Sequence, residues 1–137
     1  MQRIILDTNI VVSALIRKSY PYYIVYDYVF NEQVQLCLSE ALLSEYRDVL
    51  SRPKFAKVSN FENNAKLILS RFTKIALFYE PKIRLSIIKD KSDNKLLELA
   101  HESNADFLIT GNNTDFTITH YKHTQILSPR SFWEMLK

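Results

Sequence analysis

Short apolar runs alternate along the chain with longer segments in which apolar residues recur every three or four positions. This alternation of strand-like and helix-like segments is typical of a parallel sheet covered by helices. Four apolar runs predict strands, at residues 3–6, 34–39, 106–110 and 124–128. Six longer segments predict helices, at residues 9–18, 21–30, 39–53, 60–72, 92–104 and 129–137. The pattern therefore predicts one α/β domain over residues 1–137 with a mostly parallel sheet.

Single residues fix several helix ends. Ser39 suits the N-cap of the helix that follows it, and Pro53 suits its end. Ser92 is the expected cap of the helix over 92–104. The apolar run over 76–88 is ambiguous between helix and strand, and part of it is expected to be a strand.

Composition and charge narrow the picture further. The 137 residues are 47% hydrophobic and 24% charged, which is typical of a globular domain that folds without disulfides. Cys37 is the only cysteine and lies between leucines, so a buried, inert thiol in a reducing cytoplasm is expected. No apolar segment is long enough to span a membrane, and no signal-peptide pattern opens the chain. The net charge of +3 permits binding to a polyanion without requiring it.

Acidic residues follow or interrupt the apolar runs. Asp7 comes directly after the first strand, where it suits either an N-cap or a ligand at a strand end. Glu45 lies inside the apolar arc of its helix, between Ala41 and Val49. A carboxylate on a buried stripe is unfavourable unless it is paired or binds a metal, although a half-exposed acid at the edge of the arc remains an alternative.

Three further acids map to the same edge of the sheet. Asp90 and Asp93 precede the helix over 92–104, where the helix dipole alone favours them. Asp115 follows the strand over 106–110 in a turn rich in asparagine, which is ordinary by itself. Four carboxylates about 5 Å apart would repel by roughly 3 kcal/mol per pair, so a counter-ion is expected. Mg²⁺ or Mn²⁺ accepts such oxygen ligands and points to phosphodiester chemistry.

Four spaced motifs together resemble the PIN domain, and in particular the VapC-like PIN proteins regarded as toxins of toxin-antitoxin systems. They are LDTNIVVSAL near the start, SEALLSEYRDVLSRPKF, DKSDNKLLELAHESNADFLITGN and ILSPRSFWEML at the end. The likeness covers nearly the whole chain in the right order. It implies a three-layer α/β/α sandwich with a central parallel sheet, and a metal-dependent ribonuclease that hydrolyses RNA. It also implies an antitoxin partner and a homodimer.

The resemblance assigns roles by motif. Asp7 matches the first acid with Asn9 beside it, Glu45 the second and Asp93 the third, with Asp90 as a possible helper. Many members carry an aspartate where this chain has Asn112, whereas others carry asparagine there and an aspartate at the position of Asp115. Thr110 and Ser13 match polar positions near the acidic centre, and either could equally be structural. Gly111 is the only glycine, and it would leave room at the strand end for a metal-bound substrate.

Basic residues at the helix ends are candidates for phosphate contacts, although solvated helix ends explain them equally well. They are Arg17, Lys18, Arg52, Lys54 and Lys57.

Other functions fit less well. An aspartyl phosphatase would need a second acid two residues after Asp7, where the chain has Asn9. A zinc site is suggested only by the spacing of His120 and His123, without further ligands. A catalytically inactive PIN-like module that binds RNA or protein remains the main alternative. In that case the aromatic segment 20–30 would be a docking surface, although an aromatic stripe is more often core.

Overall fold

The computed structural model describes residues 1–88, 91–111 and 118–136, without the side chains of Lys91 and Ser92. The strands are β1 (Arg3–Leu6), β2 (Gln35–Leu38), β3 (Leu77–Phe78), β4 (Phe107–Ile109), β5 (His120–Tyr121) and β6 (Thr124–Leu127). The helices are α1 (Thr8–Ile16), α2 (Tyr20–Tyr23), α3 (Glu40–Leu50), α4 (Phe61–Ile75), α5 (Lys91–Ser103) and α6 (Pro129–Leu136). A π-helix, η1 (Ile24–Val29), and a 3₁₀ turn, η2 (Pro53–Phe55), complete the described elements.

The six strands form one sheet in the order β3-β2-β1-β4-β6-β5. Every pair is parallel except β5 with β6, which confirms the expected mostly parallel sheet. The chain builds the sheet outward in both directions from the central pair β1 and β4. A crevice forms outside the carboxyl ends of the strands at such a reversal, and ligands bind there in open α/β sheets.

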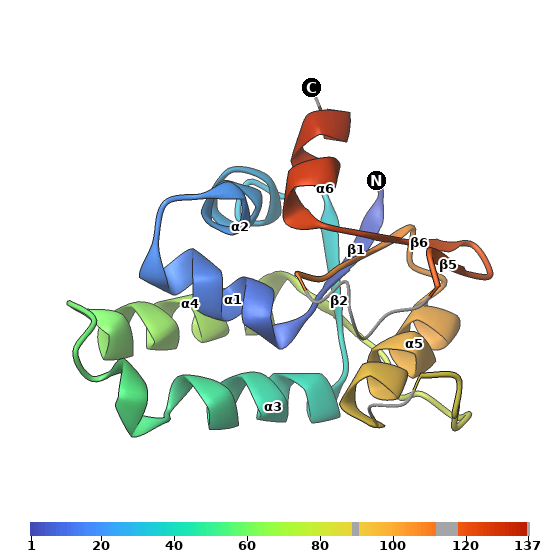
Figure 1. Cartoon of the computed structure of the whole chain (residues 1–137), viewed down its shortest axis with the longest axis horizontal. Coiled ribbons are helices and arrows are strands. Elements are labelled where there is room, and N and C mark those ends of the chain that lie inside the picture. The colour runs from blue at the N-terminus through green and yellow to red at the C-terminus, as the bar shows by residue number, and fades with distance from the viewer. Residues whose placement is uncertain (89–90, 112–117, 137) are drawn as a thin grey trace.

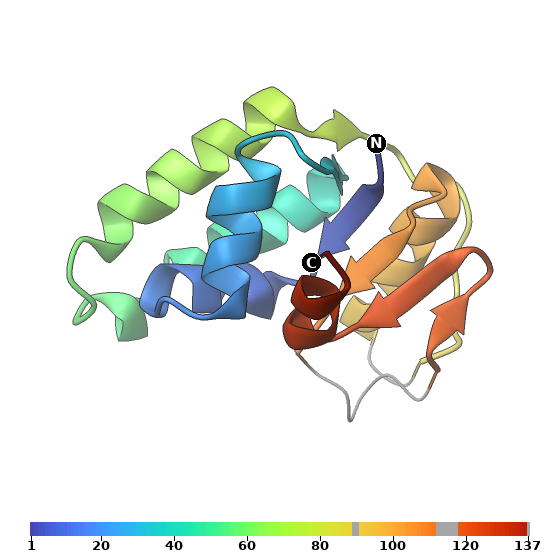
Figure 2. The same cartoon turned by 90° about the horizontal axis from the view of Figure 1, so that it is seen from above.

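Helices cover both faces of the sheet, as the α/β/α prediction requires. Helices α1, α2 and α4 lie on one side of the central strands and α5 lies on the other (Figure 1). The view from above shows the same separation, with α6 beside α2 (Figure 2). Strands β1, β2 and β4 are almost entirely buried between these layers, and Cys37 is buried in β2 as expected. No helix among the described residues is long and apolar enough to cross a membrane.

Several boundaries differ from the sequence prediction. The helix expected over 21–30 is α-helical only to Tyr23 and continues as the π-helix η1. The helix expected over 39–53 ends at Leu50, because Pro53 opens the separate turn η2. Helix α5 begins at Lys91, so Ser92 lies inside it and is not its cap. The short antiparallel strand β5 was not predicted.

Helix α3 is fixed at its start and in its middle. Ser39 is its N-cap, as predicted, and its hydroxyl accepts a hydrogen bond from the Leu42 amide at 3.1 Å. The buried Tyr46 donates a hydrogen bond of 2.5 Å to the carbonyl of Leu6, the last residue of β1. Burial, with the nearby carboxylates Asp7 and Glu45, raises the pKa of Tyr46 well above its ordinary value, so the phenol stays neutral. Tyr46 thus joins α3 to the end of β1.

Three polar side chains, one helical turn apart on α5, hold the segment that leads into this helix. Asn94 and Glu98 are buried, and each accepts hydrogen bonds from backbone amides of the preceding segment. The Asn94 amide also donates to the Ile88 carbonyl at 2.5 Å, so it binds this backbone in both directions. The amide donors are Lys82 to Glu102, Leu85 to Glu98, and Ile87 and Ile88 to Asn94. The ladder positions the chain on the approach to Asp93.

Replacing Asn94 with alanine is expected to destabilise the protein by about 1–3 kcal/mol, because the buried Ile88 amide, the partly buried Ile87 amide and the Ile88 carbonyl lose their partner. Urea unfolding of the purified variant measures this loss. The matched control is Lys95→Ala, at the exposed neighbouring position, which should change stability by less than about 0.5 kcal/mol. Equal unfolding midpoints for the two variants would contradict the proposed ladder.

Candidate functional site

The site begins where β1 and β4 end side by side. The Asp7 amide donates to the Ile109 carbonyl at 3.0 Å, which extends the pairing of the two strands by one step. The Thr110 hydroxyl then donates a buried hydrogen bond of 2.7 Å to Oδ2 of Asp7. Asp7 occupies the N-cap position of α1, yet its side chain makes no capping hydrogen bond there. Its carboxylate is therefore oriented by β4 rather than used as a helix cap.

Glu45 reaches the same place from α3. Because Tyr46 is bonded to the end of β1, the preceding residue Glu45 lies against the start of α1, where the Thr8 hydroxyl donates a hydrogen bond to its Oε2. The side chain is half-buried, and Ala41 one turn earlier is exposed rather than buried. Glu45 therefore lies at the edge of the apolar arc, which is the alternative that the sequence left open.

Asp93 enters from the opposite side of the sheet, in the first turn of α5. Its side chain is only 6% exposed, almost the same as Asp7 at 7%. An acid that only stabilised a helix start through the dipole would be expected to remain in solvent. Asp93 directly precedes Asn94, the first residue of the ladder that holds the incoming segment against α5.

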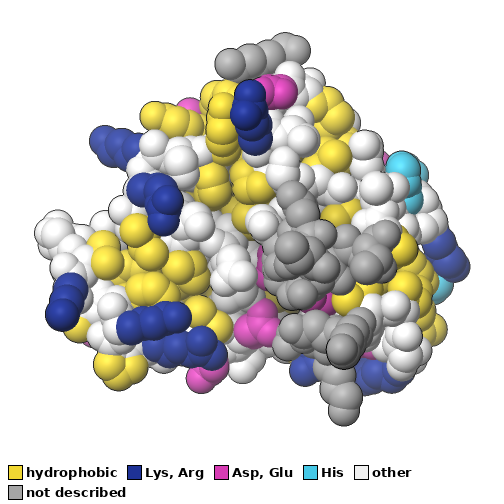
Figure 3. Space-filling view, viewed as in Figure 1, with side chains coloured by type: hydrophobic (Ala, Val, Ile, Leu, Met, Phe, Trp, Pro, Cys, Tyr) yellow, Lys and Arg dark blue, Asp and Glu magenta, His cyan; other side chains and the backbone are white. Residues whose placement is uncertain are grey.

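One cavity of about 450 Å³ joins the three acids. Its lining combines carboxylates with two cations and a few apolar side chains. The lining residues are Asp7, Thr8, Asn9, Val12, Glu45, Val49, Arg52, Lys54, Phe55 and Asp93. Figure 3 shows one face of the molecule, with Asp and Glu side chains near its centre and Lys and Arg side chains beyond them toward the lower left. The cavity therefore has an acidic end and a basic end.

The electrostatics of Asp7 reflect this crowding. Burial raises the pKa of Asp7 above its ordinary value, and the negative charge of Glu45 adds to the increase. The hydrogen bond from Thr110 and the nearby amides of Thr8 and Asn9 offset part of it. Ionised Asp7 is thus stabilised by hydrogen-bond donors, but no described residue gives it a positive partner.

The carboxylates do not form a ready cage for an ion. Within residues 1–88, 91–111 and 118–136, no three acidic, histidine or cysteine side chains are close enough together to hold a metal. Carboxylate oxygens nevertheless suit Mg²⁺, which keeps several water ligands and is commonly held by one or two carboxylates. The oxygen donors are of the type that Mg²⁺ and Mn²⁺ accept, but binding of an ion by these acids stays a prediction.

The remaining predicted positions divide into three groups. The cavity is lined by Asn9, Arg52 and Lys54. Thr110 does not line it but donates a hydrogen bond to Asp7. The lining also lacks the other predicted positions, which are Ser13, Arg17, Lys18 and Lys57. Lys18 lies over the Tyr22 ring instead, at 5.8 Å from its centre. Asp90, Asn112 and Asp115 fall outside the described residues.

The contacts of the described residues do not explain why residue 111 is glycine. Its backbone has no positive φ, and the nearest described atom to a Cβ placed there would be Cδ1 of Ile10 at 3.9 Å, an ordinary contact. The described residues therefore do not require the missing side chain. The role of Gly111 toward a substrate stays a prediction.

The two histidines do not assemble a zinc site among the described residues. His123 bonds to the Asp106 carboxylate at 2.7 Å, and His120 bonds to the Thr119 hydroxyl at 2.8 Å. Each ring therefore has a local structural partner of its own.

Thr8 is the site residue that the sequence did not single out. It stands inside the LDTN motif, beside Asp7 and Asn9. Its proximity to Glu45 depends on the packing of α1 against α3. Only a three-dimensional contact between these helices could have assigned its partner.

The comparisons with known proteins agree with this architecture. The sequence pattern of the PIN domain matches residues 3–114, which is most of the chain. The chain belongs to the PIN domain family. PIN domains are generally nucleases, and the three acids lie within the matched residues.

Two individual proteins are similar to this PIN domain. An uncharacterized protein of Methanocaldococcus jannaschii is 26% identical over 140 residues, covering 96% of this chain and 90% of that protein. A chain in the crystal structure of VapBC2 from Rickettsia felis, bound to a DNA fragment from their promoter, has a TM-score of 0.60 and 18% identity. That match covers 93% of this chain and 98% of the other, and it shows a shared fold.

Because the pKa of Asp7 is raised, replacing this acid with a neutral residue is expected to stabilise the metal-free protein. Below the ordinary pKa of aspartate, Asp7 is protonated in the folded and unfolded protein alike. As pH rises through the higher folded pKa, ionisation inside the fold destabilises the metal-free protein. Asp7→Asn should therefore unfold at higher urea than the wild type at about pH 7 in EDTA, and the difference should shrink as pH falls toward the ordinary value. A wild type more stable than the variant at neutral pH would contradict this assignment.

Proposed function

We propose that the protein is a metal-dependent endoribonuclease that hydrolyses RNA phosphodiester bonds. The observation that carries the proposal is the convergence of Asp7, Glu45 and Asp93, from three separate segments, on one cavity that also exposes Arg52 and Lys54. A cluster of carboxylates with no cation among them destabilises the folded protein. Carboxylates with basic side chains nearby are the arrangement that binds a divalent ion together with a phosphate group. Membership of the PIN domain family supports the nuclease class.

In this proposal Asp7, Glu45 and Asp93 hold Mg²⁺ or Mn²⁺, directly or through water, and Asp90 and Asp115 are further candidates for the same site. A bound ion of this kind lowers the pKa of a water ligand and stabilises negative charge on a phosphate. The chain's own residues orient the acids. Thr110 donates to Oδ2 of Asp7 and Thr8 donates to Oε2 of Glu45, and each carboxylate keeps further lone pairs that could bind an ion.

Cations at the other end of the cavity complete the site. Arg52 and Lys54 are exposed and would contact RNA phosphates, which positions a strand without reading its sequence. Asn9 is exposed on the same lining and would contribute a polar contact.

We also propose a partner and a location. The structural neighbour belongs to a complex named VapBC2, which supports an antitoxin as the partner of this chain. A reducing cytoplasm suits the buried free thiol of Cys37, whose pKa burial raises to about 11. A homodimer stays a prediction from the family resemblance.

Loss of the hydroxyl at Thr8 is expected to weaken metal binding. Thr8→Val removes the donor to Glu45 without changing the side-chain volume greatly, and the affinity for Mn²⁺ should fall by about 10- to 100-fold, as is usual for partners of metal ligands. Isothermal titration with Mn²⁺ alone measures this. Thr8→Ser keeps the hydroxyl and should restore most of the affinity. Affinity that is kept by Thr8→Val and lost by Thr8→Ser would mean that the methyl packing matters rather than the hydrogen bond.

Removing one carboxylate at a time tests the function. Asp7→Asn, Glu45→Gln and Asp93→Asn should each reduce Mn²⁺-dependent cleavage of single-stranded RNA by about 100-fold or more, because each loses charge that holds the ion. Glu40→Gln is the matched control, since this exposed acid lies on α3 outside the cavity. RNA fragments resolved on a denaturing gel give the rates.

The wild type decides between the two candidate functions. An RNA-binding module without catalysis would bind RNA and release no fragments at any Mn²⁺ concentration. Cleavage that survives EDTA, or that is equally fast in the three variants and the control, would also overturn the proposal.

A further inference from the structure

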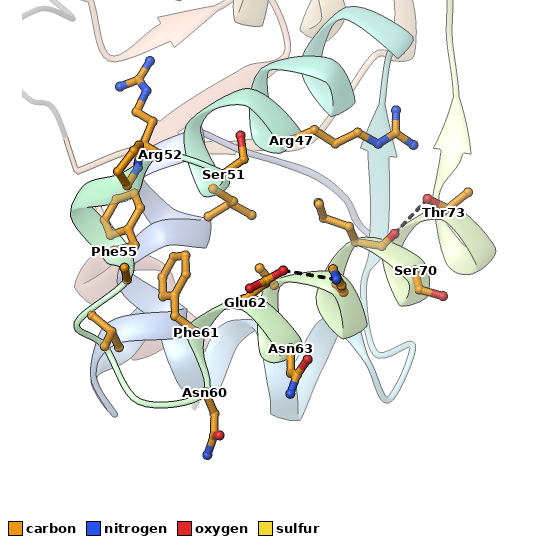
Figure 4. Close-up of a pocket in the computed structure, with 17 residues that line it drawn as sticks. Arg47, Ser51, Arg52, Phe55, Asn60, Phe61, Glu62, Asn63, Ser70 and Thr73 are labelled. Carbon is orange, nitrogen blue, oxygen red and sulfur yellow. Dashed lines mark hydrogen bonds and ion pairs between the residues drawn. The ribbon is translucent and has the colours of Figure 1, made fainter.

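A second and larger cavity lies beside the acidic one, between α3 and α4. Its volume is about 830 Å³, and its walls are the C-terminal half of α3, the turn η2 and α4 from Phe61 to Thr73 (Figure 4). Arg52 and Phe55 line this groove and also line the acidic cavity. The two cavities therefore meet at η2, and a ligand that extends out of the acidic site in this direction enters the groove.

The exposed lining of the groove is cationic and polar. Arg47, Arg52 and Lys66 line it together with one carboxylate, Glu62, and the Arg52 side chain extends outward at its border (Figure 4). Lys66 pairs with Glu62 at 3.3 Å and Arg52 pairs with Asp48 at 3.5 Å, and all four side chains are at least half exposed. Exposed ion pairs contribute little to stability, so their cations can readily bind another anion instead. Arg47 makes no ion pair with any described residue, so the groove offers positive charge to an incoming ligand.

The apolar lining of the groove is partly a buried floor. Phe55 and Phe61 stack with ring centres 4.6 Å apart, and they are only 8% and 4% exposed. Val58 and Leu69 are half-buried in the same lining and present some apolar surface. The choice of a polyanion over an apolar helix therefore rests on the cations of the lining and on the border that the groove shares with the acidic cavity. Hydroxyl and amide side chains on the rim also suit a polar ligand, and they are Ser51, Asn60, Asn63, Ser70 and Thr73.

We propose that this groove binds the single-stranded RNA that flanks the cleaved bond. The substrate runs from the acidic cavity past Arg52 into the space between α3 and α4, where Arg47 and Lys66 bind its phosphates. Grooves for single strands combine such cations with a surface that does not distinguish bases. Because the phenylalanine rings are covered, the groove contributes phosphate binding rather than base stacking. The proposal rests on the proposed function, in which RNA is the substrate.

Direct binding tests the groove without requiring cleavage. The protein is prepared as Asp7→Asn so that the RNA stays intact, and fluorescence anisotropy follows a labelled single-stranded RNA about 12 nucleotides long. Adding Arg47→Gln with Lys66→Gln should weaken binding by about 10-fold or more at moderate salt. The slope of log affinity against log salt should become shallower by about 0.7 for each phosphate that the variant no longer neutralises. The matched control, Lys74→Gln with Lys82→Gln, removes two exposed charges outside both cavities and should stay within about twofold.

Cleavage by otherwise wild-type protein separates the groove from the proposed function. A dinucleotide short enough for the acidic cavity alone should be cut equally well by the wild type and the groove variant, whereas the longer RNA should be cut more slowly by the variant. Absence of any cleavage overturns the proposed function, while the binding data still decide the groove. The groove proposal is wrong if the groove variant binds the RNA as tightly as the control does. It is equally wrong if the groove variant still binds the RNA but no longer binds a protein partner.

Discussion

Thr110 and Asp7 are 103 residues apart in the chain, and the hydrogen bond between them depends on the pairing of β1 with β4. This pairing places two strand ends side by side at the point where the sheet reverses its direction of growth. Helix α3 joins the same point through the bond from Tyr46 to Leu6, and α5 approaches it from the other face of the sheet. The site is therefore a consequence of parallel topology, since all the carboxyl ends of the central strands meet at one edge.

That arrangement brings carboxylates together inside the fold, and their mutual repulsion destabilises the folded protein. Asp7 is buried, its pKa is raised, and the charge of Glu45 adds to the effect. Two threonine hydroxyls orient the carboxylates without supplying positive charge. A divalent ion would neutralise them, and the cations that begin at Arg52 would hold a polyanion beside it. The acidic cavity and the basic groove are thus complementary halves of one proposed surface, the first for the ion and the second for the strand.

The sequence predicted the parts of this design that depend on short-range patterns. Buried strands and the Ser39 cap follow from local residue preferences, and the gathering of Asp7, Glu45 and Asp93 followed from their places at strand ends and on a helix. Contacts between distant elements were out of reach. Thr8 was not singled out, because its partner lies 37 residues away on α3. Asn94, Glu98 and Glu102 are spaced one turn apart, which signals a polar face, but their partners are backbone amides of an irregular segment. The role of Gly111 beside a bound substrate stays a prediction.

The central claim is that the three acids share a divalent ion. A crystal of the wild-type protein soaked in Mn²⁺ and measured at the manganese absorption edge tests it most directly. The account predicts an anomalous peak in the cavity between Asp7, Glu45 and Asp93, within coordination distance of at least one carboxylate oxygen or of its bound water. Saturating Mn²⁺ that leaves this cavity without a peak, or that binds only elsewhere on the surface, would contradict it.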